Sequence, residues 1–167
     1  MERESKVDES PRGRPRGGPG NALRGALDGA PLSPAVRGTA AVAGLVAAGL
    51  LLTAARLHPD PSGRGTHQQL GLPPCSFVLL WNIPCPACGM TTSWALVTQG
   101  RLVAAMRANA GGALLAIIAL AYIPSSCYFF LRGVATRGQW FSLFLATALV
   151  LALVAAIAQW LARLAAG

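Results

Sequence analysis

The chain has 167 residues, of which 53% are hydrophobic and only 12% are charged, whereas about a quarter are charged in ordinary soluble domains. Its formal net charge of +8 comes from 14 Lys and Arg residues against 6 Asp and Glu residues. Half of the basic residues lie before the first apolar run, and the others lie mostly at the ends of apolar segments, as in membrane proteins. No nucleic-acid-binding motif is present. This composition excludes an ordinary soluble domain and predicts an all-α membrane protein that contacts the lipid bilayer and binds no nucleic acid.

Residues 1–37 are predicted to form a disordered, basic tail. Pro and Gly are frequent there without a period, and the apolar surface is too small to offset the entropy lost on ordering. The tail also carries half of the basic residues of the chain. Because positive charge is retained on the cytoplasmic side, we expect a multi-pass protein of the cell membrane with a cytoplasmic N-terminus.

Residues 38–167 are predicted to form a helical membrane domain with about three transmembrane helices. The spans are expected at about 38–57, 109–131 and 139–162, each an apolar run between arginines. At 1.5 Å per residue, the uncharged core of the first run reaches about 27 Å, near the thickness of the hydrocarbon layer. With three spans and a cytoplasmic N-terminus, the loop between the first two spans lies outside.

The sequence predicts a structural role for three residues of the second span. Asn109 can cap its start, because an Asn side chain accepts a hydrogen bond from a free N–H of the first turn. Pro124 should kink the helix, and neighbouring serines can satisfy the freed backbone groups. Cys127 is expected to be a small buried apolar residue.

The connection between the first two spans, residues 58–108, is the cysteine-containing loop. The apolar piece 77–81 within it is too short to cross a bilayer but can dip into the membrane surface. Residues 90–108, broken at Gly100, are predicted to form a short interfacial helix pair. Thr91, Thr92 and Ser93, at its start, are expected to cap the first of these helices.

Cys85 and Cys88 form a C-x-x-C turn, stiffened by flanking prolines and followed by Gly89, which we call the cysteine knuckle (residues 84–89). The two sulfur atoms of such a turn can come close together, and this arrangement is compatible with three kinds of cysteine chemistry. The first is a redox pair, in which Cys88 is the better nucleophile because it directly precedes a helix whose dipole stabilises a thiolate.

The second chemistry is a metal site. Zinc or iron would be held by Cys75, Cys85 and Cys88, with His67 or His58 as the fourth ligand of a closed site. The third chemistry is structural, with Cys75 joined to one cysteine of the knuckle. In each case the three cysteines are predicted to form one local cluster from which Cys127 stands apart.

Several segments resemble a small bacterial membrane-protein family, labelled domain of unknown function 2752. They are Cys75, the core Pro84-Cys85-Pro86-Ala87-Cys88-Gly89-Met90-Thr91-Thr92, the stretch Gly100-Arg101-Leu102-Val103-Ala104-Ala105, and Asn109. The resemblance covers roughly residues 70–125. Many members carry Arg at the position of Thr92 and Pro at that of Ala110, so no charge-dependent role is carried over to Thr92. The resemblance implies a small helical membrane protein and supplies no activity.

Function is therefore expected to be that of an interaction or scaffold subunit with a structural knuckle, whose partner is another membrane protein or a second copy of the chain. The alternative is a thiol-redox or metal-binding membrane protein that uses Cys85, Cys88 and Cys75. A small transporter is less favoured, because no charged residue lies in the interior of a predicted span. Enzymatic activity is not expected, since no paired carboxylates and no Ser-His-Asp set occur.

Overall fold

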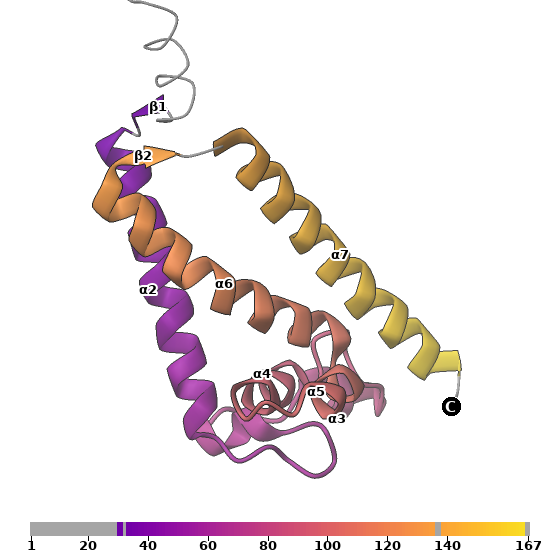
Figure 1. The fold of residues 1–167 in the computed structure, drawn as a ribbon. Helices are drawn as coiled ribbons and strands as arrows, with labels where there is room; N and C mark the ends of the chain where they lie inside the picture. The colour runs from indigo at the N-terminus through magenta and orange to yellow at the C-terminus, as the bar shows by residue number, and fades with distance from the viewer. Residues whose placement is uncertain (1–29, 32, 136–137, 166–167) are drawn as a thin grey trace, which may run out of the picture.

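The computed structural model describes residues 30–31, 33–135 and 138–165 (Figure 1). The fold is all-α, as predicted. Three long helices are α2 (Pro34–Arg56), α6 (Ala110–Arg132) and α7 (Gly138–Ala165). Between α2 and α6 lie the short helices η1 (Thr66–Leu70), α3 (Ser76–Trp81), α4 (Met90–Thr98) and α5 (Leu102–Ala108). Two residue pairs, β1 (Ala30–Pro31) and β2 (Val134–Ala135), join in antiparallel fashion beside the start of α2.

Among the described residues, three helices are long and apolar enough to cross a membrane: Pro34–Arg56, Ala110–Arg132 and Phe141–Ala165. Most of their large apolar side chains are exposed, as expected for helices surrounded by lipid tails. The expectation of a multi-pass protein with about three spans is therefore confirmed. Of the predicted tail, residues 1–29 and 32 lie outside the described residues.

Helix α2 begins inside the predicted tail, before residue 38. Ser33 caps it by accepting a hydrogen bond from the Val36 N–H at 3.3 Å, and Pro34 occupies the first turn, where a missing N–H costs nothing. The sequence predicts the start of this helix at residue 38, directly after Arg37. Arg37 nevertheless belongs to the helix, and its guanidinium donates a hydrogen bond to the Phe130 carbonyl near the end of α6.

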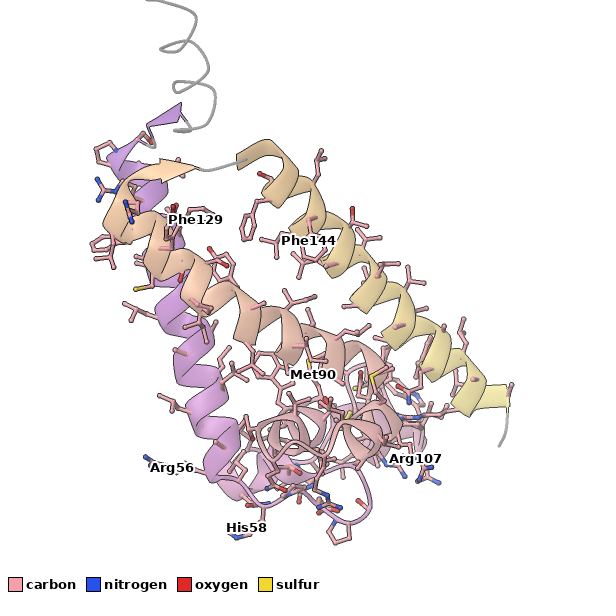
Figure 2. All side chains as sticks on the ribbon, in the orientation of Figure 1. Arg56, His58, Met90, Arg107, Phe129 and Phe144 are labelled. Carbon is pink, nitrogen blue, oxygen red and sulfur yellow. The ribbon has the colours of Figure 1, made fainter. Side chains whose placement is uncertain are left out.

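The chain places one end of each long helix together, and we call this the cysteine end. Helix α2 ends there, α6 begins there and α7 ends there, with the whole 57–109 connection packed beneath them (Figure 1). Figure 2 shows Arg56, His58 and Arg107 at this end, whereas Phe129 and Phe144 lie toward the other. The polar side chains of the 57–109 connection therefore lie at one end of the apolar helices.

The predicted helix pair after the knuckle is present as α4 and α5, but the two helices differ in burial. Helix α4 packs into the core, where Leu96 and Val97 join Leu51 of α2 and the alanines of α6. Helix α5 exposes Leu102, Val103 and Met106. The core is therefore built at the cysteine end, where it holds the knuckle in place.

Helix α6 begins as expected. Asn109 caps it through a hydrogen bond that its Oδ1 accepts from the Gly112 N–H at 2.8 Å. Pro124 lies inside the helix, and the Ser125 hydroxyl donates to the Ala121 carbonyl at 2.9 Å.

Cys127 is exposed, which corrects the expectation that it is buried. The preceding Ser126 faces α2, where a Cβ on Gly44 would overlap with it. The next residue is rotated by about 100° and so points away from that contact.

Candidate functional site

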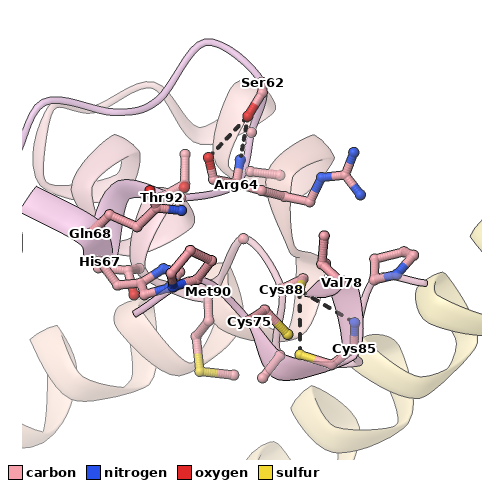
Figure 3. Close-up of a pocket in the computed structure, with 18 of the residues that line it drawn as sticks. Ser62, Arg64, His67, Gln68, Cys75, Val78, Cys85, Cys88, Met90 and Thr92 are labelled. Atoms are coloured by element: carbon pink, nitrogen blue, oxygen red, sulfur yellow. Dashed lines mark hydrogen bonds between the residues drawn. The ribbon is translucent and has the colours of Figure 1, made fainter. Parts of the chain in front are cut away.

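Cys75, Cys85 and Cys88 lie together at the cysteine end (Figure 3). Cys75 precedes the first turn of α3, and the other two form the turn before α4. Their three sulfur atoms all lie within 4.8 Å of one another, and the Sγ atoms of Cys85 and Cys88 are 3.4 Å apart. The three cysteines predicted to gather thus form one cluster, to which Cys127 does not belong.

The three thiols have different environments. Burial raises the pKa of Cys88, and the neighbouring thiols of Cys85 and Cys75 raise it further, to about 12, against a hydrogen bond from the Cys85 N–H. Burial also raises the pKa of Cys75, but hydrogen bonds to its sulfur, first from the Val78 N–H and then from the two other thiols, outweigh this and lower it to about 7. Of Cys75 and Cys88, Cys75 therefore has the more acidic thiol.

This finding differs from the sequence expectation that Cys88 is the better nucleophile. The helix begins at Met90 as predicted, with Gly89 as its N-cap. Cys88 lies one residue further back and is only 8% exposed. Desolvation of its thiolate therefore outweighs stabilisation by the helix dipole, which fades within one turn.

The histidines proposed as a fourth ligand do not join the cluster. His67 borders the same pocket, but one of its ring nitrogens, Nε2, lies 3.2 Å from the Pro73 carbonyl oxygen. His58 is engaged through its backbone with the side chain of Gln69. Within the described part of the chain, the donor atoms close enough to share a metal are those of the three cysteines.

The backbone of the knuckle is held by α6 and α7. The indole Nε1 of Trp160 donates to the Pro84 carbonyl at 2.7 Å. The side-chain amide of Asn109 donates to the carbonyls of Pro86 and Cys88, at 3.0 and 3.2 Å. Sequence reasoning missed the Trp160 contact, because its partners are 76 positions apart and nothing local in the sequence marks the pair.

Gly89 lets the knuckle approach its neighbours closely. Its φ of +87° is left-handed, and a Cβ there would lie 2.5 Å from the Ala108 carbonyl oxygen and 2.7 Å from that of Gly63. Only glycine fits both requirements. The knuckle is therefore packed tightly between the end of α5 and the loop after α2.

Thr92 has a role that the sequence did not indicate. Its hydroxyl forms a 2.8 Å hydrogen bond with that of Thr66, which also accepts from the Asp60 N–H at 3.0 Å, and both threonines are buried. The expected side-chain cap of α4 is not formed, since Gly89 caps it and the Ser93 hydroxyl donates back to the Met90 carbonyl. Thr92 thus fastens the loop after α2 to α4.

A pocket of about 1160 Å³ opens beside the cysteines (Figure 3). Its walls come from the loop after α2, the knuckle, and the ends of α5 and α7. Besides the three cysteines, the polar and basic side chains that line it are Ser62, Arg64, His67, Gln68, Asn82, Thr91, Thr92, Arg107 and Arg163. Among the described residues that line it, none is Asp or Glu.

Comparison with known families gives a match over part of the chain. The model of the family described as Protein of unknown function (DUF2752) matches residues 75–123, from Cys75 through the knuckle, α4 and α5 into the first half of α6. The resemblance seen in the sequence is therefore confirmed over this stretch. No curated protein and no solved structure matches the chain. The similarity covers the cysteine cluster, together with the Asn109 contact that holds it, and its description carries no activity.

Proposed function

We propose that this chain is a membrane interaction subunit in which Cys75, Cys85 and Cys88 bind one zinc ion as thiolates. The observation that carries the proposal is the convergence of three sulfurs, from two loop segments, within 4.8 Å. Tetrahedral zinc with Zn–S bonds of about 2.3 Å places its sulfur ligands about 3.8 Å apart. The 3.4 Å between the sulfurs of Cys85 and Cys88 is close to this value.

Zinc accounts for the cluster better than the other chemistries of cysteine. An iron–sulfur cluster normally takes four cysteines, whereas three converge here. A disulfide uses two thiols and leaves the third beside it without a role. Three thiolates leave one position of zinc for water or another ligand, as in zinc sites with three protein ligands.

Zinc at this place would fix the shape of the cysteine end. It would join the segment before α3 to the knuckle, whose carbonyls already accept hydrogen bonds from Asn109 and Trp160. Short helices at this end carry exposed apolar side chains, among them Leu80 and Trp81 of α3 and Val103 of α5. Such a rigid, partly apolar surface suits contact with a membrane protein or a second copy of the chain, with lipid headgroups around it.

For orientation, we propose that the protein lies in the cell membrane with its N-terminus in the cytoplasm. The basic residues of 1–37 support this side, because positive segments are retained there. The cysteine end then faces the opposite side. A membrane-impermeant maleimide, applied to intact cells after metal and disulfides are removed, should label the cluster. Labelling only after the membrane is opened would reverse the orientation.

A thiol-redox role is the second candidate, and the acidic thiol of Cys75 beside the Cys85–Cys88 pair favours it. In that reaction, Cys85 and Cys88 would lose two electrons and two protons and close a disulfide. A disulfide in an acceptor protein would take both and become two thiols.

Metal analysis separates the two candidates. The chain, purified in detergent without chelator, should carry one zinc per molecule by mass spectrometry of the metals. Cys75→Ser and Cys88→Ser should lose that zinc, and Cys127→Ser, which changes a cysteine outside the cluster, should retain it. A folded wild-type protein without metal, whose thiols react with maleimide only after reduction, would reject zinc and support the redox candidate.

A further inference from the structure

Three arginines from three parts of the chain border the cysteine pocket. Arg64 comes from the loop after α2, Arg107 from the end of α5 and Arg163 from the last turns of α7. In Figure 3, Arg64 extends toward the side of the pocket on which the cysteines lie. The pocket is therefore strongly basic, although the three residues are far apart in the sequence.

The positive charge of these arginines has no acidic partner among the described residues that line the pocket. In the part of the chain that the structure describes, no Asp or Glu lines the pocket, and no hydrogen bond or ion pair engages the guanidinium of Arg64 or Arg107. Arg163 donates through Nη2 to the carbonyls of Arg107 and Ala108, at 2.9 and 2.6 Å. These bonds fix its position at the pocket wall and leave its other N–H groups available.

The cysteines do not remove this surplus of charge. Three thiolates with one Zn²⁺ carry a single negative charge, against three positive charges on the arginines. If the thiols are protonated or joined in a disulfide, the surplus is larger still. The excess of positive charge holds in either state, so it does not depend on the proposed zinc.

We propose that this pocket binds a phosphate group, held by the guanidinium groups of Arg64, Arg107 and Arg163. Guanidinium groups match phosphate oxygens with paired, charge-assisted hydrogen bonds. The hydroxyl of Thr91 and the amide of Gln68 also line the pocket and can add neutral hydrogen bonds. A volume of about 1160 Å³ is far larger than a bare phosphate needs, so the group would be part of a larger polar molecule.

Two kinds of molecule can supply the phosphate group. The pocket lies where α2 ends and α6 begins, at the depth at which lipid headgroups are expected. The phosphate of an anionic phospholipid therefore fits, and so does that of a free phosphorylated molecule. Both would meet the same three guanidinium groups, and only the experiment distinguishes them.

Titration of the full chain in a maltoside detergent, which contains no phosphate, tests the proposal. Calorimetry with dihexanoyl phosphatidylglycerol and, separately, with glycerol phosphate should show saturable binding of one molecule per chain for at least one ligand. Binding of the lipid alone assigns a headgroup, and equal binding of both assigns a free phosphorylated molecule. Absence of saturable binding with both ligands overturns the proposal.

Matched variants show whether the pocket is responsible for phosphate binding. Arg64→Gln and Arg107→Gln should each weaken binding about tenfold, since each removes charged hydrogen bonds to the phosphate. Arg56→Gln removes the same charge from the same end of the molecule, outside the pocket, and should leave the affinity unchanged. A loss with Arg56→Gln as large as with the pocket variants would mean non-specific attraction and would overturn the assignment.

Zinc content, measured on the same samples, keeps the two proposals apart. Zinc-loaded protein that binds neither ligand would reject the phosphate site alone. Zinc-free protein that binds phosphate and loses binding with Arg64→Gln would reject the metal centre alone. If Arg64→Gln fails to fold, Arg107→Gln carries the test, because Arg107 is exposed and its guanidinium has no partner among the described residues.

Discussion

The side-chain amide of Asn109 donates a hydrogen bond to the backbone carbonyl of Cys88 at 3.2 Å. The same amide group donates to Pro86, while the oxygen of the side chain accepts from Gly112 and caps α6. A single buried residue, 1% exposed, therefore joins the knuckle to the start of a membrane helix. The cysteine cluster and α6 are positioned by the same side chain.

Substitutions of Asn109 should separate its two roles. Asn109→Ser keeps a hydroxyl that can cap α6 but cannot reach the knuckle, and should lower the free energy of unfolding by about 2 kcal/mol, about 1 for each lost hydrogen bond. Asn109→Ala loses the cap as well and should cost about 1 kcal/mol more. Thermal and denaturant unfolding in detergent, followed by circular dichroism, measure the series. Equal stability of wild type and Asn109→Ser would show that the contacts with Pro86 and Cys88 contribute nothing.

Gly89 is predicted to be irreplaceable, and Gly100 provides the matched control. Both have left-handed backbones, with φ of +87° and +73°, but a Cβ at Gly100 meets nothing within 4 Å. Gly100→Ala should therefore cost only the conformational penalty, about 1 kcal/mol. Gly89→Ala should cost about 3 kcal/mol or more, because its Cβ would overlap with the Ala108 and Gly63 carbonyls. Similar losses in both variants would contradict the close packing of the knuckle.

The crossing of α6 and α7 depends on Gly111. A Cβ at this position would overlap with the Ala152 carbonyl and would lie 2.5 Å from the Cβ of Ala156. Gly111→Ala should therefore separate the helices and destabilise the protein by about 2 kcal/mol, as overpacking does. Gly49→Ala, in α2 with open space around the new Cβ, should be neutral or stabilising, since Ala favours helix more than Gly does. The same unfolding assays check the pair, and a destabilised Gly49→Ala with a neutral Gly111→Ala would reject this packing.

The thiols of metal-free, reduced protein should differ in reactivity with pH. Because the pKa of Cys75 is lowered to about 7, its thiolate forms, and alkylation by iodoacetamide accelerates, as the pH rises through 7. Cys88, with a pKa raised to about 12, should stay slow throughout the neutral range. Peptide mass spectrometry of a Cys127→Ser background gives each rate. Faster labelling of Cys88 than of Cys75 at pH 7 would contradict the environments described for the two thiols.

Much of the architecture follows from local sequence. The apolar runs bounded by arginines predict three long helices, because their length matches the thickness of the bilayer and because apolar runs of this length are unfavourable in water. The cap by Asn109 was also predictable, since a cap needs only a side chain and the next turn. The start of α2 at Pro34 does not follow from the apolar pattern, because that pattern places the helix boundary at the charged Arg37, whereas the helix includes this residue.

The contacts that hold the site could not be predicted, because they join distant positions. Trp160 and Pro84 meet across 76 positions, and Thr66 and Thr92 across 26. Such pairs depend on how the helices cross, which the apolar periodicity of a membrane helix does not specify. The burial of Cys88 is likewise a tertiary effect, and it reverses the acidity expected from the position before a helix.

X-ray absorption at the zinc edge of the purified chain tests the central claim most directly. The account predicts one zinc per chain with three sulfur neighbours at about 2.3 Å and one lighter neighbour. Cys75→Ser should lose the zinc and with it the absorption signal. A zinc shell of nitrogen and oxygen alone, or a folded protein without zinc, would contradict the assignment of Cys75, Cys85 and Cys88 as a metal centre.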